Sequence, residues 1–448
     1  MNQEPLDLAL RASHVLTMNA SGRCLTPGFV GIRDGRIVSV EPYKQGMEAA
    51  WNPKRFLALD RHIVFPGLIN AHTHLGMGFF RGIEDDLPLE TWLKERVFPL
   101  EAALVTEELV YSASLLGMVQ MLLSGTTTFV DMYYFEEAAA RAAERLGVRA
   151  FLGPGVLDMP TPGVPDAETG LRRLEAFIES YSGHPRITPI LAPHAPYTCS
   201  DRTLKALRAL KERFGLRATI HVQETSGELQ ESLRRFGKTP LERLESLGFL
   251  DSNVLCAHMV WLGAGDREVL ERARPGVAHC PNSNLKLGSG VCNVAELRDM
   301  GLLVGIGTDS VASNDSLDMV REMKTAALLQ KALHADPSRM GAKETLGLAT
   351  SEAAKALGMG DQLGSIEAFK RADLVAAEIN TVRDFPCHDP YAHLVYTLTG
   401  SHVSTVILAG EVAVFDGRLV NDPTEEALDT WQETASRVGR ELERLKKG

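Results

Sequence analysis

Polar side chains follow several short apolar runs in the middle of this 448-residue chain. Imidazole and carboxylate groups are ligands that zinc and iron(II) accept in proteins. His72 and His74 are two positions apart, so alternation along a strand would direct both to the same side. One histidine at a strand end is more often structural, but the joint pattern favours a metal site. The polar residues at the ends of these runs are His72, His74, His194, His221, Glu224, His258 and Asp309.

These residues need strands to position them, and the middle of the chain supplies eight apolar runs separated by helical patterns. Such alternation predicts an α/β protein with a parallel sheet, and eight units predict a (β/α)8 TIM-like barrel. A doubly wound open sheet is the alternative, but no G-x-G-x-x-G follows the first run. In a barrel the carboxyl ends of the strands would form the active site. The runs cover residues 62–74, 126–132, 149–158, 187–194, 217–224, 253–258, 276–280 and 304–309.

The two ends of the chain have a different pattern, rich in short β segments. Asp34-Gly35 and Asp416-Gly417 lie between apolar runs, which is a strong hairpin signal. We therefore expect one small β-sandwich built from both termini. The predicted domains are 1–65 for the first part of the sandwich, 66–362 for the barrel, and 363–448 for the rest with a terminal helix. That amphipathic helix, about 425–446, would pack on its own subunit or on another copy in a homo-oligomer.

Composition narrows the class of protein. The 47 basic and 58 acidic side chains give a net charge of −11, which argues against binding nucleic acid. The most apolar helical stretch, Leu115 to Leu123, is too short to cross a membrane. The first 20 residues lack a secretory signal pattern, and the six cysteines form no C-x-x-C pair. We expect a cytoplasmic protein with reduced thiols that acts on a small molecule, with no membrane partner.

Several motifs resemble the amidohydrolase superfamily, in its cytosine-deaminase-like branch. They are PGLINAHTHLG at 66–76, HVQET at 221–225, HCPNSNLKLGSG at 279–290 and GIGTDSVASNDSLDM at 305–319. The segments at 79–101 and 191–200 are similar to methylthioadenosine/S-adenosylhomocysteine deaminases. The resemblance implies a metal-dependent hydrolytic barrel. It also implies hydrolytic deamination of an adenine nucleoside, namely methylthioadenosine, S-adenosylhomocysteine or adenosine, to its inosine analogue and ammonia.

The resemblance also implies how many metal ions are bound. A binuclear centre in the family uses a carboxylated lysine at the end of the fourth strand, and the segment 187–194 contains no lysine. We therefore expect one divalent metal, most simply zinc, with iron(II) or manganese(II) as alternatives. Its expected ligands are His72, His74, His221 and Asp309.

The remaining polar residues receive expected roles in the reaction. Glu224 would shuttle protons as general acid and base, and Asp309 would accept a proton from the attacking water. His258 would orient that water and help to stabilise the developing charge. His194 and Glu101 would contact the substrate, with Glu101 at the ribose hydroxyls. The simpler alternatives are a solvated glutamate at a helix start for Glu224 and an exposed helix residue for Glu101.

One departure from the family concerns the substrate. In the family, an arginine contacts the amino-acid carboxylate of S-adenosylhomocysteine. The corresponding position in this chain is Pro154, so Arg172 or Arg173 would have to take the place of that arginine. Other enzymes of the branch are the nearest rivals: a guanine, pterin or cytosine deaminase, or a triazine hydrolase. A non-catalytic scaffold barrel is the rival of another class.

Overall fold

The computed structural model describes residues 4–83 and 86–447. Its contacts divide the chain into two compact units. The first comprises Met1–Asn70, Gln120–Thr128 and Asp318–Asp422, and the second comprises Ala71–Val119, Phe129–Leu317 and Pro423–Gly448. The α/β class predicted from the sequence is confirmed by the alternating helices and strands of the described residues.

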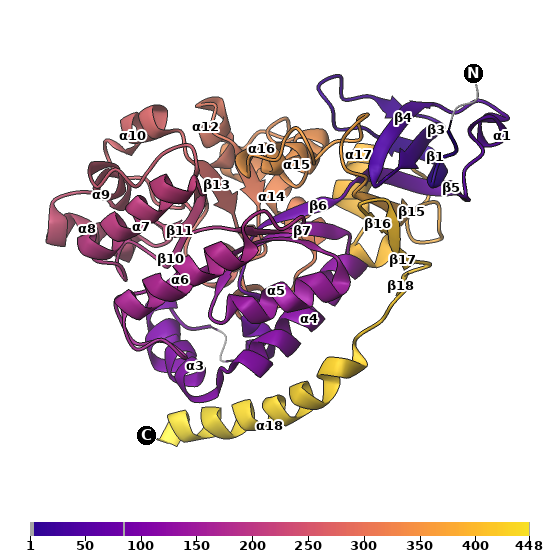
Figure 1. Ribbon diagram of the computed structural model, residues 1–448. Coiled ribbons are helices and arrows are strands. Elements are labelled where there is room, and N and C mark those ends of the chain that lie inside the picture. The colour runs from indigo at the N-terminus through magenta and orange to yellow at the C-terminus, as the bar shows by residue number, and fades with distance from the viewer. Residues whose placement is uncertain (1–3, 84–85, 448) are drawn as a thin grey trace. The chain divides into compact units, whose positions relative to one another are not determined.

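The two ends of the chain meet in one sheet of the first unit (Figure 1). Strand β5 joins them, because it pairs in parallel with β1 and antiparallel with β15. The order is β18-β17-β16-β15-β5-β1-β3-β4, and β2 pairs with β1. The strands within the described residues are β1 (Leu8–Leu16), β2 (Cys24–Leu25), β3 (Gly28–Arg33), β4 (Arg36–Pro42), β5 (Arg55–Pro66), β15 (Leu374–Glu378), β16 (Val403–Leu408), β17 (Glu411–Phe415) and β18 (Arg418–Leu419).

Both predicted hairpins of this sheet are confirmed. Asp34 and Gly35, with φ of 50° and 70°, connect β3 to β4. Asp416 and Gly417, with φ of 51° and 70°, connect β17 to β18. Aspartate followed by glycine tolerates this left-handed backbone, whose twist matches that of the paired strands.

The remaining strands form two sheets in which the strands follow chain order, with β9 and β10 both paired with β8. The orders are β10-β8-β7-β6, with β9 also on β8, and β11-β12-β13-β14. A doubly wound sheet reverses its strand order, and neither sheet does so in the described part of the chain. The strands are β6 (Leu68–Thr73), β7 (Thr126–Tyr133), β8 (Arg149–Val156), β9 (Ile187–Pro189), β10 (Ala192–Pro193), β11 (Ala218–Val222), β12 (Val254–His258), β13 (Gly276–His279) and β14 (Val304–Ile306).

Backbone contacts connect these two sheets at both edges. Leu191 forms a parallel bridge with Ala218, the first residue of β11. At the other edge, the Asp309 amide donates to the His72 carbonyl at 2.9 Å. The carboxyl ends of β6 and β14 are therefore adjacent, and the polar residues that follow them are brought together.

Two predicted strands are interrupted. The run 62–74 divides into the end of β5 and β6 at Gly67, where a Cβ would lie 2.1 Å from Thr127 Oγ1. The run 187–194 divides into β9 and β10, which end in Pro189 and Pro193. Proline has no amide proton, so it cannot complete a sheet ladder.

Helices follow most of the parallel strands, and several begin at a side-chain cap. Asp166, Ser200 and Thr225 accept hydrogen bonds from the first turns of α6, α7 and α8. The helical segments are α1 (Met47–Trp51), η1 (Leu75–Phe80), α2 (Leu89–Trp92), η2 (Leu93–Val97), α3 (Phe98–Leu104), α4 (Glu107–Leu123), α5 (Glu136–Leu146), α6 (Ala167–Tyr181), α7 (Asp201–Phe214), α8 (Ser226–Phe236), α9 (Pro240–Ser246), α10 (Asp266–Ala273), α11 (Pro281–Lys286), α12 (Val294–Asp299), α13 (Val311–Asn314), α14 (Met319–His334), α15 (Ala342–Leu348), α16 (Ser351–Ala356), α17 (Pro390–Ala392), η3 (His393–Thr397), η4 (Gly400–His402) and α18 (Glu425–Lys447).

The terminal helix α18 belongs to the second unit and runs beside α3 (Figure 1). Val438 on its apolar face is buried in a cluster that contains Trp92 and Leu100, and Leu442 packs against the same cluster. This helix thus supports the segment that carries α2, η2 and α3.

No single helix in the described ranges is long and apolar enough to cross a membrane. The pair Leu89–Leu104 and Glu107–Leu123 meets the length and composition requirement only together, and it is bent by 112°.

Candidate active site

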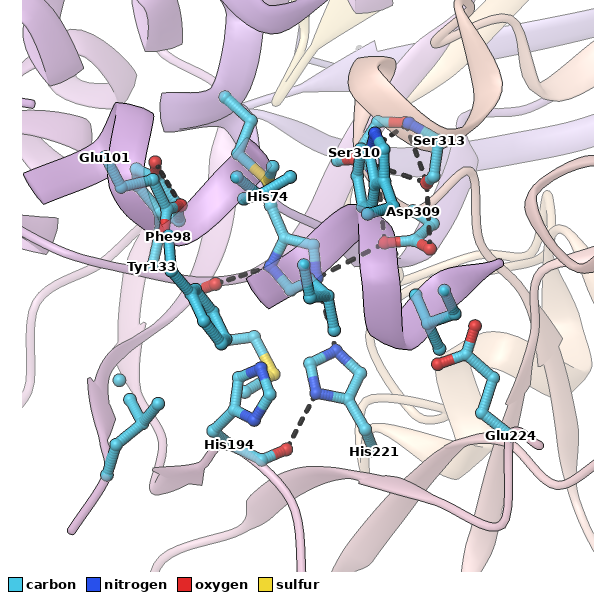
Figure 2. A pocket seen from close by; sticks show the side chains of 18 of the residues that line it. His74, Phe98, Glu101, Tyr133, His194, His221, Glu224, Asp309, Ser310 and Ser313 are labelled. Atoms are coloured by element: carbon cyan, nitrogen blue, oxygen red, sulfur yellow. Dashed lines mark hydrogen bonds and ion pairs between the residues drawn. The ribbon is translucent and has the colours of Figure 1, made fainter. Parts of the chain in front are cut away.

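Four side chains at strand ends converge on one point in the second unit. His72 Nε2 lies 3.1 Å from His221 Nε2, which lies 3.2 Å from His74 Nε2. Asp309 Oδ1 lies 3.2 Å from His74 Nε2 and 3.8 Å from His72 Nε2. His72 is fully buried, and the other three, which Figure 2 labels, are at most slightly exposed. Lone pairs brought this close in a dry interior repel each other unless a proton or cation lies among them.

The spacing of these donor atoms fits a divalent metal ion. Ligand bonds of about 2.0–2.1 Å in tetrahedral geometry separate neighbouring ligand atoms by about 3.3 Å. His74 Nδ1 donates to the Met132 carbonyl at 2.6 Å, and His221 Nδ1 donates to the His194 carbonyl at 2.7 Å. A carbonyl only accepts, so Nδ1 of each ring carries a proton, and Nε2 is the ring atom left to bind a cation.

Hydrogen bonds also orient the carboxylate of Asp309. Its Oδ2 accepts from Ser283 Oγ at 2.6 Å and from Ser313 Oγ at 3.1 Å. Burial opposes ionisation here, but His74 and the other imidazoles hold the pKa of Asp309 well below its usual range. The group is a carboxylate whose Oδ1 is directed at His74.

His258, at the end of β12, lies beside the same centre. Its ligand atom, together with those of His72 and His221, forms a second group whose members are within 4.8 Å of one another. Its Nε2 lies 3.6 Å from Glu224 Oε2. Burial lowers the pKa of His258 to about 4, so its ring is neutral at neutral pH. Geometry alone therefore offers two overlapping sets of ligands.

Glu224 follows β11 and is only 7% exposed, which is not the environment of a solvated glutamate. Burial, and then the charge of Asp309, raise the pKa of Glu224 to about 8. Ser289 Oγ donates to its Oε1 at 3.2 Å. The carboxyl therefore carries a proton at neutral pH and lines the same cavity as Asp309.

The cavity extends from the metal-ligand cluster to Glu101. Glu101 is buried on α3, with Tyr133 Oη donating to one carboxylate oxygen at 2.7 Å and Tyr134 Oη to the other at 3.3 Å. Burial raises the pKa of Glu101 to about 7. Glu101 is thus not an exposed helix residue. In Figure 2 it lies with Tyr133 on one side of His74, while Asp309 and Glu224 lie on the other.

His194 also lines the cavity and lies between these two sides, next to His221 (Figure 2). Its Nδ1 is 3.0 Å from Thr198 Oγ1, and burial lowers its pKa to about 3. The ring is neutral and can exchange hydrogen bonds with a bound molecule through Nε2.

Sequence reasoning missed the aromatic wall of the cavity. Its members lie on α2, on α3, at the end of β7 and just after it, and after β10. Adjacent tyrosines at a strand end were the available signal. They are Trp92, Phe98, Tyr133, Tyr134 and Tyr197.

No arginine or lysine is among the described residues that line the cavity. Arg172 and Arg173 are both exposed on α6, and Arg172 pairs with Glu168 at 2.9 Å. The wall near Pro154 is instead formed by Gly155 and Leu157.

Comparison with known proteins defines the class. Residues 63–413 match the model of the amidohydrolase family, and the chain belongs to this family of hydrolases. It is 39% identical over 421 residues to the 5-methylthioadenosine/S-adenosylhomocysteine deaminase of Thermodesulfovibrio yellowstonii, covering 94% of this chain and 96% of that one. It is 37% identical to the 5'-deoxyadenosine deaminase of Methanosarcina mazei, covering 96% and 98%. The structure of a zinc-bound adenosine deaminase from Xanthomonas campestris superposes with a TM-score of 0.94 at 33% identity, covering 98% and 99%.

Proposed function

We propose that this chain is a metal-dependent hydrolytic deaminase of adenine nucleosides. The supporting observation is that metal donors and the buried carboxyl of Glu224 face one cavity. The chain is also similar to relatives named as deaminases of methylthioadenosine, S-adenosylhomocysteine and 5'-deoxyadenosine. This similarity supports the same function and favours an enzyme over a non-catalytic scaffold.

In this proposal His72, His74, His221 and Asp309 hold one divalent cation, which supplies a water-derived nucleophile at neutral pH. Zinc is our proposed metal, because three imidazoles and one carboxylate at near-tetrahedral spacing suit it. Iron(II) and manganese(II) are alternatives that metal analysis would identify.

Glu224 supplies the protons that deamination needs. Its carboxyl donates to the ring nitrogen next to the amino-bearing carbon, which lets that carbon become tetrahedral. Glu224 then accepts a proton from the attacking oxygen and delivers it to the departing ammonia. Asp309 accepts the other proton of the attacking water and returns it to Glu224 once ammonia has left, which restores the starting state. His258 stabilises the charge that develops on the oxygen.

Glu101 and His194 position the nucleoside. With its two tyrosine donors in place, Glu101 retains lone pairs that can accept from ribose hydroxyls. The aromatic wall would pack against the base and the sugar. An acidic and apolar cavity favours an uncharged 5' group over the amino-acid carboxylate of S-adenosylhomocysteine, so we rank methylthioadenosine and adenosine ahead of it.

We also propose how the strands are arranged into a barrel and a small β domain. The sequential strand order and the contacts at both sheet edges support a closed (β/α)8 barrel over residues 66–362. The shared sheet of both chain ends supports a small β domain from residues 1–65 and 363–448, with α18 packing on the second unit instead. Residence in the cytoplasm and homo-oligomer formation stay predictions.

A substrate panel tests the activity. Ammonia release should be measured with zinc-loaded protein and methylthioadenosine, S-adenosylhomocysteine, adenosine and 5'-deoxyadenosine. Guanine, cytosine, a pterin and a chlorinated triazine serve as comparison substrates. We expect the adenine nucleosides to have the highest kcat/KM, and a higher value for any comparison substrate would contradict the proposal.

A further inference from the structure

The short helix α11 contacts two groups of the proposed site that lie on different strands. Ser283 on this helix donates to Asp309 Oδ2, which follows β14. The next residue, Asn284, lies against His258, at the end of β12: its Nδ2 is 3.0 Å from His258 Nδ1. Asn284 is buried and does not line the cavity, so it acts on a substrate only through His258.

We infer that Asn284 makes His258 a hydrogen-bond donor toward the cavity and so excludes it from the metal-ligand set. The amide nitrogen of Asn284 donates, so His258 Nδ1 must accept with its lone pair. A neutral imidazole has one ring proton, which then resides on Nε2. The catalytic role of His258 in this inference rests on the proposed function, but the position of its ring proton can be measured without assaying activity.

His74 and His221 have the opposite arrangement. Carbonyl oxygens, which only accept, face Nδ1 of His74 and of His221. Those rings therefore present a bare Nε2, which can bind a cation, whereas His258 presents an N–H, which cannot. The Nδ1 partners thus favour His74 and His221 as metal ligands and disfavour His258.

Nε2, on the other side of the His258 ring, faces Glu224. Glu224 Oε2, a carboxyl oxygen, lies 3.6 Å from it. A donor at this position points toward the region between Glu224 and Asp309, where the attacking oxygen must lie. Asn284 is therefore a positioning residue, and His258 is the group that would touch the reacting atoms.

The direct test is the tautomer of His258 in the zinc-loaded enzyme. Histidine side chains would be labelled with ¹⁵N, and the His258 signals among the 13 histidines would be assigned by their loss in His258→Gln. We expect a bare Nδ1 and a protonated Nε2. A protonated Nδ1 with a bare or metal-bound Nε2 would overturn the inference, whatever the activity of the enzyme.

The second test is Asn284→Asp, a change of nearly the same shape that replaces the donor with an acceptor. We expect the proton to move to Nδ1, kcat to fall by up to about 100-fold, and KM and zinc content to stay within twofold. Asn253→Asp is the control: it makes the same change at an exposed residue just before β12, at the opposite end of that strand from His258, and should retain kcat. An unchanged tautomer or unchanged kcat in a folded Asn284→Asp protein would refute the positioning role. If that variant does not fold, the tautomer of the unmodified enzyme decides.

Discussion

Glu224→Gln separates metal binding from proton transfer. The substitution keeps the shape of the side chain and its ability to accept from Ser289, but it removes the titrating proton. Because burial raises the pKa of Glu224 to about 8, the protonated form predominates at pH 7, and most of the enzyme begins in the active form. Loss of a positioned general acid and base costs about 10²- to 10⁴-fold, so we expect kcat to fall by that factor.

The same substitution should leave the fold and the metal intact. Glutamine removes a buried group that would repel Asp309 when ionised, so the Tm should stay the same or rise slightly. Zinc content, measured on the purified protein, should match that of the unmodified enzyme, because Glu224 is not among the proposed ligands.

Glu228→Gln is the control for this experiment. Glu228 is on α8 four residues later, burial also raises its pKa to about 8, and it accepts from the Glu224 amide. It does not line the cavity, so the control should retain at least a tenth of the activity. Ammonia release by Glu224→Gln within tenfold of the unmodified enzyme would show that our assignment of the proton shuttle is wrong.

The other predictions concern metal, substrate and packing. Removal of metal with a chelator should abolish ammonia release and lower the Tm, and zinc should restore both; activity in metal-free protein would contradict the proposed centre. Glu101→Gln should raise KM for adenosine about tenfold or more with little change in kcat, because a charged hydrogen bond contributes about 1.5–3 kcal/mol, and an unchanged KM would remove Glu101 from ribose binding. The raised pKa of Glu101 is about 7, so its carboxylate becomes protonated as the pH falls through 7. KM should therefore rise about tenfold per pH unit below pH 7, and this rise should be absent in Glu101→Gln. Val438→Asp should lower the Tm measured by thermal unfolding, since it places a charge in the cluster around Trp92; an unchanged Tm would argue against the packing of α18.

The sequence was most informative where chemistry coincides with a strand end. His72, His74, His221 and Asp309 could be predicted to share one face, because the period of a strand and the edge of a parallel sheet fix where their side chains emerge. The hairpin turn at Asp34-Gly35 could also be predicted, since the left-handed backbone that it requires depends only on these two residues.

Contacts between segments distant in the chain could not be predicted from the sequence pattern. Glu101 meets Tyr133 across 32 residues, and nothing in the pattern of α3 distinguishes that buried carboxyl from an exposed one. The hydrogen bond between Asn284 and His258 depends on the packing of α11 against the end of β12, which no periodicity encodes. The strand interruptions at Gly67 and at Pro189 also depend on neighbouring chain segments and on missing amide protons.

The central place of β5 in the shared sheet has a consequence for biosynthesis. One edge of β5 pairs with β1. The other edge stays unpaired until β15 has been synthesised, about 300 residues later. At translation rates of about 5–20 residues per second, that edge stays open for about 15–60 s, exposed to pairing with other nascent chains. Yield in an expression host should therefore respond to chaperone supply and growth temperature more strongly than the stability of the finished enzyme would suggest.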